Sequence, residues 1–193
     1  LDLVLVTSPE NIFYLSGYAG WSFYTSQLLL VSLGDNPVWL GRAMDLPCAE
    51  QTCFMPDPAS YDVYPDELVD AAEPHAMHHM AAQIRGRWPA ARRIGVEMES
   101  YFFSFAAGKR LRAGMDNCAL VDVTDILNRL RLVKSAAEIR YMREAAAISD
   151  AAMARAADVL QAGARECDAA AAITAALIAG TDECPGDQPA EVV

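Results

Sequence analysis

The stretch that decides the fold class is Gln27-Leu-Leu-Leu-Val-Ser-Leu-Gly-Asp-Asn-Pro-Val-Trp-Leu-Gly41. Residues 27–33 and 37–41 are apolar runs rich in residues that favour strands. The Gly34-Asp35-Asn36 segment between them has the composition of a short turn. The pattern therefore predicts an antiparallel hairpin.

Apolar runs on both sides of the hairpin alternate with helical patterns. Short strands are predicted at residues 3–7, 61–64, 94–98 and 119–123. Helices are predicted at residues 11–15, 44–54, 74–88 and 101–113. Alternation of strands and helices indicates an α/β domain. Because the hairpin comes early and the later strands are linked by helices, we expect a mixed β-sheet flanked by helices.

The character of the sequence changes after Arg131. Ser135-Ala-Ala-Glu138 is a capping box, in which the serine and glutamate side chains satisfy free amide groups of a starting helix. A long helix is predicted over residues 138–160 and an alanine-rich helix over residues 167–179. Residues 185–193 begin a new extended segment, so few partners for these helices lie within the chain. We expect a first domain over residues 1–130 and the start of a second, truncated domain over residues 131–193.

Composition limits the partners and the compartment. The formal net charge of −11 makes nucleic acid an unsuitable partner, since phosphate binding needs clustered Lys and Arg. The longest apolar stretches, residues 28–33 and 169–179, are too short to span ~30 Å of hydrocarbon, so no membrane partner is expected. Five cysteines, an odd number without C-x-x-C spacing, are interpreted as reduced thiols of a cytoplasmic protein.

Residues 17–27 are the main candidate for a ligand site. The segment holds four aromatic residues and two glycines directly before a predicted strand. Aromatic side chains at this density can line a pocket for a small organic ligand. Alternatively, Trp21, Phe23 and Tyr24 fill the core between the hairpin and the helices. The residues themselves leave both interpretations open.

Two other clusters are weaker candidates. His75, His78 and His79 have a helical spacing that zinc ligands can use, but no glutamate completes the known motif. Glu97 and Glu99 alternate at a strand end, so we expect their carboxylates on one side, where such acids usually face water or cap a helix. No phosphate loop and no G-x-S-x-G elbow occur. The sequence thus shows no self-sufficient catalytic centre.

Three segments carry a family resemblance. Asn11-Ile-Phe-Tyr-Leu-Ser-Gly-Tyr18, Arg93-Ile-Gly-Val-Glu97 and Leu130-Arg-Leu-Val-Lys-Ser-Ala-Ala-Glu-Ile139 resemble, in order and spacing, motifs of the creatinase, prolidase and aminopeptidase P family. Gly20-Trp-Ser-Phe-Tyr24 and Arg93-Ile-Gly-Val-Glu-Met98 most resemble its ectoine hydrolase branch. The resemblance covers nearly the whole chain. It implies a creatinase-type amino-terminal domain followed by the first helices of a pita-bread catalytic domain.

The resemblance also implies a hydrolase of C–N bonds that acts on a small zwitterionic or peptide-like substrate as a homodimer. Divalent metal ions are possible in the full-length enzyme. The resemblance places the catalytic residues and any metal ligands beyond residue 193, so we expect no catalytic residue and no bound metal in this fragment. The alternatives are an Xaa-Pro aminopeptidase or dipeptidase, and a non-catalytic domain for dimerisation or partner binding.

Only the aromatic segment carries over residue by residue. In creatinase-like relatives, an aromatic and an arginine of this stretch reach the active site of the neighbouring subunit. Phe23 falls on the aromatic position and Thr25 on the arginine position. Because Thr25 cannot make a bidentate contact with a carboxylate, creatine-like recognition is not expected. Substrate contacts across the dimer are therefore predicted for Trp21, Phe23, Tyr24 and Thr25.

Overall fold

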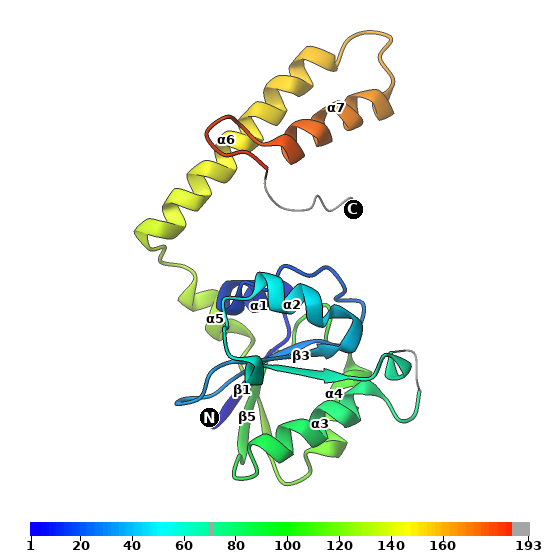
Figure 1. The fold of residues 1–193 in the computed structure, drawn as a ribbon, viewed down its shortest axis with the longest axis vertical. Helices are drawn as coiled ribbons and strands as arrows, with labels where there is room; N and C mark the ends of the chain where they lie inside the picture. Colours follow the sequence, from blue (N-terminus) through cyan, green and yellow to red (C-terminus); the bar gives the residue numbers. More distant parts are fainter. Residues whose placement is uncertain (70–71, 187–193) are drawn as a thin grey trace. The chain divides into compact units, whose positions relative to one another are not determined.

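The computed structural model describes residues 1–69 and 72–186. A six-stranded sheet in the order β4-β3-β2-β1-β5-β6 forms the centre of the first part of the chain (Figure 1). Its strands are β1 (Leu3–Val6), β2 (Leu28–Val31), β3 (Val38–Arg42), β4 (Tyr61–Tyr64), β5 (Arg93–Val96) and β6 (Ala119–Asp122). The pairs β1–β2 and β2–β3 are antiparallel, whereas β1–β5, β3–β4 and β5–β6 are parallel. The predicted mixed sheet is confirmed.

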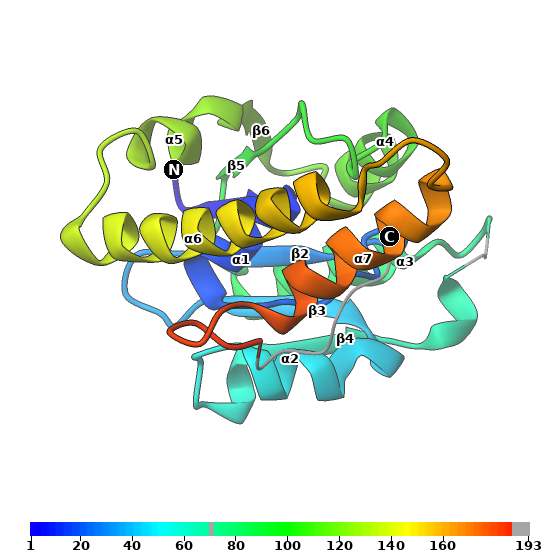
Figure 2. The ribbon, with the colours of Figure 1, turned by 90° about the horizontal axis from the view of Figure 1, so that it is seen from above.

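Helices cover both faces of this sheet (Figures 1 and 2). On one face lie α1 (Pro9–Ser16), α2 (Leu46–Thr52) and α5 (Thr124–Leu130), and on the other lie α3 (Ala76–Arg87) and α4 (Phe105–Gly114). Short 3-10 helices at Ala43–Asp45, Pro58–Ser60 and Asp66–Leu68 join some of these elements. The domain is therefore a three-layered α/β structure with a hydrophobic core on each side of the sheet.

Strand β2 shows why apolar residues run without interruption in the central strands. Leu28 and Leu30 belong to the core cluster beneath α3 and α4, whereas Leu29 belongs to the cluster beneath α1 and α2. Trp39 of β3 is fully buried in the same cluster as Leu29. Successive side chains of a strand point to opposite faces, so a strand covered on both faces needs apolar residues at every position.

The chain divides into two compact units: the first is Leu1–Arg131, and the described part of the second is residues 132–186. The second unit contains α6 (Ala136–Val159) and α7 (Glu166–Ala179), which pack against each other. The expected capping box starts α6: the Glu138 amide donates to the Ser135 hydroxyl, and the Ser135 amide donates to the Glu138 carboxylate. Residues 187–193, most of the expected terminal extended segment, lie outside the described residues.

Some boundaries differ from the sequence prediction. Helix α1 has two turns rather than one, because Pro9 occupies its first position and Gly17 ends it in the left-handed conformation with φ of 80°. Helix α4 begins at Phe105 rather than at residue 101, because the Ser104 hydroxyl accepts a hydrogen bond from the Ala107 amide and caps it there. Helix α5 was not predicted from the sequence.

The described residues were also searched for membrane-spanning helices and for disulfides. No helix among residues 1–69 and 72–186 has both the length and the hydropathy to cross a bilayer. All five cysteines lie in the described part of the chain, and none of them forms a disulfide there.

Candidate functional site

The aromatic segment, residues 17–27, connects α1 to β2 and folds back over the core. The segment can fold back in this way because residue 20 is a glycine: an added Cβ there would collide with the Tyr18 hydroxyl oxygen. Tyr18 itself is buried, and its ring lies 5.2 Å from that of Trp39. Any side chain at position 20 would therefore displace the tyrosine on which the segment rests.

The four predicted site residues divide by burial. Phe23 is buried, with its ring centroid 6.0 Å from Tyr18 and 5.6 Å from Phe102. Thr25 is also buried, and its hydroxyl donates to the Ser22 carbonyl at 2.8 Å. These contacts fix a tight turn. The structure leaves Trp21 and Tyr24 57% and 73% exposed, so the segment presents two aromatic side chains to solvent from a buried anchor.

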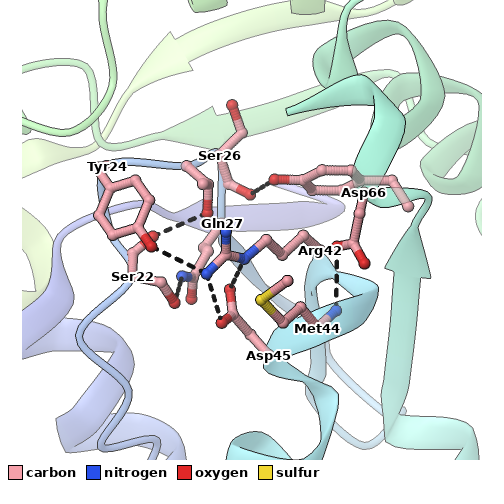
Figure 3. A network of polar contacts seen from close by, with 10 residues as sticks. Ser22, Tyr24, Ser26, Gln27, Arg42, Met44, Asp45 and Asp66 are labelled. Carbon is pink, nitrogen blue, oxygen red and sulfur yellow. Dashed lines mark hydrogen bonds and ion pairs between the residues drawn. The ribbon is translucent and has the colours of Figure 1, made fainter. Parts of the chain in front are cut away.

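A cation that the sequence reasoning missed lies beside Tyr24. The guanidinium of Arg42 donates to the Tyr24 hydroxyl oxygen at 3.0 Å and binds the Asp45 carboxylate through two hydrogen bonds of 2.8 and 3.1 Å (Figure 3). Its carbon Cζ lies 5.3 Å from the centroid of the Tyr24 ring. Asp45 raises the pKa of Arg42 above its ordinary value through these hydrogen bonds. Arg42 therefore remains charged and orients the tyrosine.

The position of Arg42 follows from the hairpin register. Leu28 pairs with Leu40 in the antiparallel ladder, so Arg42, two residues further along β3, comes beside the residues that precede β2. Asp45 follows three residues later in a short 3-10 helix. The sequence did contain a signal for this ion pair, because Arg42 lies at the end of a predicted strand and Asp45 follows it at i+3. That Arg42 lies beside the aromatic segment becomes clear only once the strand register is known.

Polar contacts hold the strands on both sides of this arrangement. The Gln27 side-chain amide donates to the Ser22 hydroxyl at 3.1 Å, and the Tyr64 hydroxyl donates to the Ser26 carbonyl at 2.9 Å (Figure 3). Burial raises the pKa of Tyr64 to about 12 and raises the pKa of Tyr18 further. The base of the segment thus consists of buried polar side chains, and both tyrosines in it stay neutral in the physiological pH range.

Two of the three histidines, His75 and His78, cap a helix. The ring nitrogen Nδ1 of His75 accepts a hydrogen bond from the Met77 amide, and the His75 amide donates to Nδ1 of His78. The two imidazoles therefore form a capping box at the start of α3. Among residues 1–69 and 72–186, no three His, Cys, Asp or Glu side chains gather closely enough to hold a metal ion. The described residues thus do not fit a metal centre.

Glu97 and Glu99 do not share an environment, contrary to the expectation from their alternation. Glu97 is completely buried, and its carboxylate accepts hydrogen bonds from the Thr7 and Ser8 amides at 2.7 and 2.8 Å. Glu99 is exposed. The difference arises because β5 ends at Val96, so the strand alternation no longer applies beyond it.

Comparison with known proteins gives a consistent result. The family model described as the Creatinase/Prolidase N-terminal domain matches residues 1–133. The chain is 40% identical to an uncharacterized hydrolase/peptidase of Sinorhizobium fredii over 96% of its length, and 36% identical to the ectoine hydrolase of Halomonas elongata over 84%. These matches cover 47% and 41% of the two relatives, so the chain spans about half the length of the curated relatives it matches.

Solved structures share the fold. The X-Pro aminopeptidase from Thermotoga maritima superposes with a TM-score of 0.67 at 17% identity, covering 92% of this chain and 46% of that one. At this identity the likeness concerns the fold alone. It shows that the mixed sheet with flanking helices also occurs in peptidases of this kind.

Proposed function

Because the chain belongs to the Creatinase/Prolidase N-terminal domain family, we propose that it is part of a C–N bond hydrolase, most like ectoine hydrolase, which acts on a small zwitterionic or peptide-like substrate. The observation that carries this proposal is the 36% identity to the Halomonas elongata ectoine hydrolase over 166 residues. The sequence identity to solved peptidase structures is lower, at 15 to 22%. The reaction centre itself is proposed to lie outside residues 1–193, and the isolated chain is proposed to be inactive.

The aromatic segment is proposed to complete the active site of the neighbouring subunit in a homodimer. Trp21 offers an aromatic face for a cationic amidine or ammonium group, a contact that contributes about 0.5 to 2 kcal/mol depending on desolvation. Tyr24 accepts a hydrogen bond from Arg42, so its own proton is available to an acceptor such as a substrate carboxylate. The two side chains together suit a zwitterion.

The buried residues of the segment are proposed to act indirectly, by holding Trp21 and Tyr24 in place. Phe23 anchors the turn between the rings of Tyr18 and Phe102, and Thr25 closes it through the Ser22 carbonyl. A contact of ~2 kcal/mol per aromatic face is far below the ~8 kcal/mol of a micromolar ligand, so the other subunit must supply most of the affinity. This is why we place the segment at the edge of a shared site.

Two other functions are kept as alternatives. The peptidase structures that share the fold favour an Xaa-Pro aminopeptidase or dipeptidase. A non-catalytic domain for dimerisation or partner binding would use the same exposed aromatics without any reaction. Activity assays of the full-length protein on ectoine and on Xaa-Pro dipeptides separate all three.

The test of the proposal uses the full-length enzyme and its Trp21→Ala variant. Phe23→Ala is a poorer probe, because emptying a buried phenylalanine site typically costs about 3 to 5 kcal/mol of stability. The matched control is Phe105→Ala, which removes an aromatic side chain that is also exposed but lies on α4. We expect Trp21→Ala to weaken binding or turnover of ectoine roughly tenfold, with the control unchanged.

Shared sites are then tested by mixing. Trp21→Ala is combined in equal amounts with a subunit inactivated at its own catalytic centre, under conditions in which subunits exchange. Activity above that of either parent is expected, because one centre in each mixed dimer meets a normal aromatic segment. Absence of recovery would show that the segment serves its own chain or only the fold.

A further inference from the structure

One residue from each of the three sequence motifs that carry the family resemblance meets the others in the first unit, where two of the three residues are buried. Asn11 comes from the motif at residues 11–18, Glu97 from that at residues 93–97, and Arg131 from that at residues 130–139. The sequence separates them by up to 120 residues. Their meeting point is separate from the polar network around Arg42, so the proposed function does not account for it.

The contacts between them form one continuous chain. The Asn11 side-chain nitrogen Nδ2 donates to Glu97 Oε1 at 2.6 Å, and Arg131 Nη1 donates to Asn11 Oδ1 at 2.7 Å. The other carboxylate oxygen of Glu97 accepts from the Thr7 and Ser8 amides. Asn11 is 1% exposed and Glu97 is fully buried. The guanidinium of Arg131 also lies 5.3 Å from the ring centroid of Tyr14 on α1.

The amide of Asn11 suits its place between an anion and a cation. A carboxylate requires a donor beside it, and a guanidinium requires an acceptor. A primary amide offers one of each, so its two neighbours also fix which way it is turned. A carboxylate at position 11 would face the Glu97 carboxylate, and an apolar side chain would leave both charged groups without this bond, which is costly for buried groups.

We propose that Glu97, Asn11 and Arg131 form a positioning clamp that fixes the last residue of the first unit to its core. Arg131 is the final residue of that unit, and Leu132, where the second unit begins, follows it directly. The clamp therefore gives the segment that enters the second unit a fixed starting point. This inference does not rest on the proposed function, because it concerns only contacts within the first unit.

The clamp has a direction of hydrogen bonding, and that direction can be tested by exchanging the acid and the amide. In Glu97→Gln, the new amide must keep its oxygen toward the Thr7 and Ser8 amides, so its NH₂ group faces that of Asn11. In Asn11→Asp, two carboxylates face each other. In the double variant, the introduced glutamine donates to the introduced aspartate, which also accepts from Arg131. Every donor then meets an acceptor again, and the network carries one negative charge as in the wild type.

Limited trypsin digestion of the chain reads out the clamp directly. Trypsin cleaves after Arg131 only when that side chain leaves its place, whereas Lys134 is exposed and serves as the internal standard. We expect each single variant to raise cleavage after Arg131 relative to Lys134 by roughly tenfold, the size expected on losing a hydrogen bond to a charged group. We expect the double variant to return the ratio toward that of the wild type. A merely less stable first unit would accelerate cleavage after Arg85, within α3, by the same factor, whereas loss of the clamp alone would leave that cleavage unchanged.

Two outcomes overturn the clamp. One is an unchanged ratio in both single variants, and the other is a double variant no closer to the wild type than either single variant. If the single variants do not fold, cooperative urea unfolding of the double variant decides: its recovery supports the clamp, and its absence overturns it.

Discussion

At the residue scale, the aromatic segment combines a side chain that is buried in the core with two that are exposed to solvent. Phe23 lies among aromatic rings, whereas Trp21 and Tyr24 project from the turn that Phe23 anchors. A rigid base matters because an exposed aromatic contact is weak, and any entropy lost in ordering it on binding would offset much of its contribution. Gly20 and Arg42 supply that rigidity, one by permitting close packing and the other by holding the tyrosine.

The buried tyrosines give a prediction for alkaline pH. Burial raises the pKa of Tyr64 to about 12 and raises that of Tyr18 above its ordinary value of 10.0. Because the pKa is higher in the folded than in the unfolded state, the stability contributed by the protonated phenols is complete below about pH 10 and is lost as the pH rises toward 12 and beyond. Urea unfolding midpoints should therefore fall steeply above about pH 10.

The control for this prediction is Tyr64→Phe. The variant loses the hydrogen bond to the Ser26 carbonyl, which costs about 0.5 to 1.5 kcal/mol of stability. It also lacks the phenol group whose pKa burial raises. Its midpoint should be lower at neutral pH but should fall less steeply in alkali. The same alkaline slope in both proteins would contradict the raised pKa of Tyr64.

At the residue level, the sequence shows local composition but not the contacts between residues that are distant in the chain. The aromatic segment could be recognised from its composition, and the structure shows which of its side chains reach solvent. Arg42 and the burial of Glu97 could not be found, because both depend on strands brought together by the sheet. Whether Trp21, Phe23, Tyr24 and Thr25 act on a neighbouring subunit's substrate stays a prediction.

At the element scale, the strands followed from apolar runs bounded by turn residues. The predicted strand at residues 61–64 coincides with β4, and the hairpin pairs antiparallel as expected. Helices were predicted less well. Their ends depend on caps such as Ser104, and a helix as short as α5 has too few residues to show a clear helical periodicity. The exception is α6, whose start was fixed by its capping box.

That capping box supports a prediction about α6. Replacing Ser135 by Ala removes the acceptor for the Glu138 amide and should cost about 0.5 to 2 kcal/mol. Amide exchange of the first turn of α6 should accelerate roughly fivefold, which corresponds to about 1 kcal/mol. Ser149→Ala is the matched control, because the Ser149 hydroxyl bonds the Ala145 carbonyl within the helix and Ala favours helices. Equal effects of the two substitutions would show that the cap is not formed in solution.

At the scale of the whole molecule, the two units differ in how much apolar surface each buries by itself. The first unit holds two extensive clusters on either side of its sheet. Among the described residues of the second unit, the buried apolar residues are Ala152, Ala156 and Ala169, whereas Met142 and Met153 are exposed. We propose that this unit is the start of a pita-bread domain in the full-length protein, whose remaining part would cover such faces.

The difference predicts unequal stability in the isolated chain. Each buried alanine methyl contributes only about 0.8 kcal/mol, whereas ordering the backbone costs ~1 to 2 kcal/mol per residue. Helices without a large buried face stay near their marginal intrinsic stability. Amide exchange followed by mass spectrometry should therefore show protection in α6 and α7 at least roughly tenfold lower than in β1 and β2, which bury apolar side chains on both faces. In the full-length protein the same helices should gain protection, while β1 and β2 should change little. Equal protection of both units in the isolated chain, at a concentration where it is monomeric, would contradict this account, because it would require stabilisation that the buried alanines cannot supply.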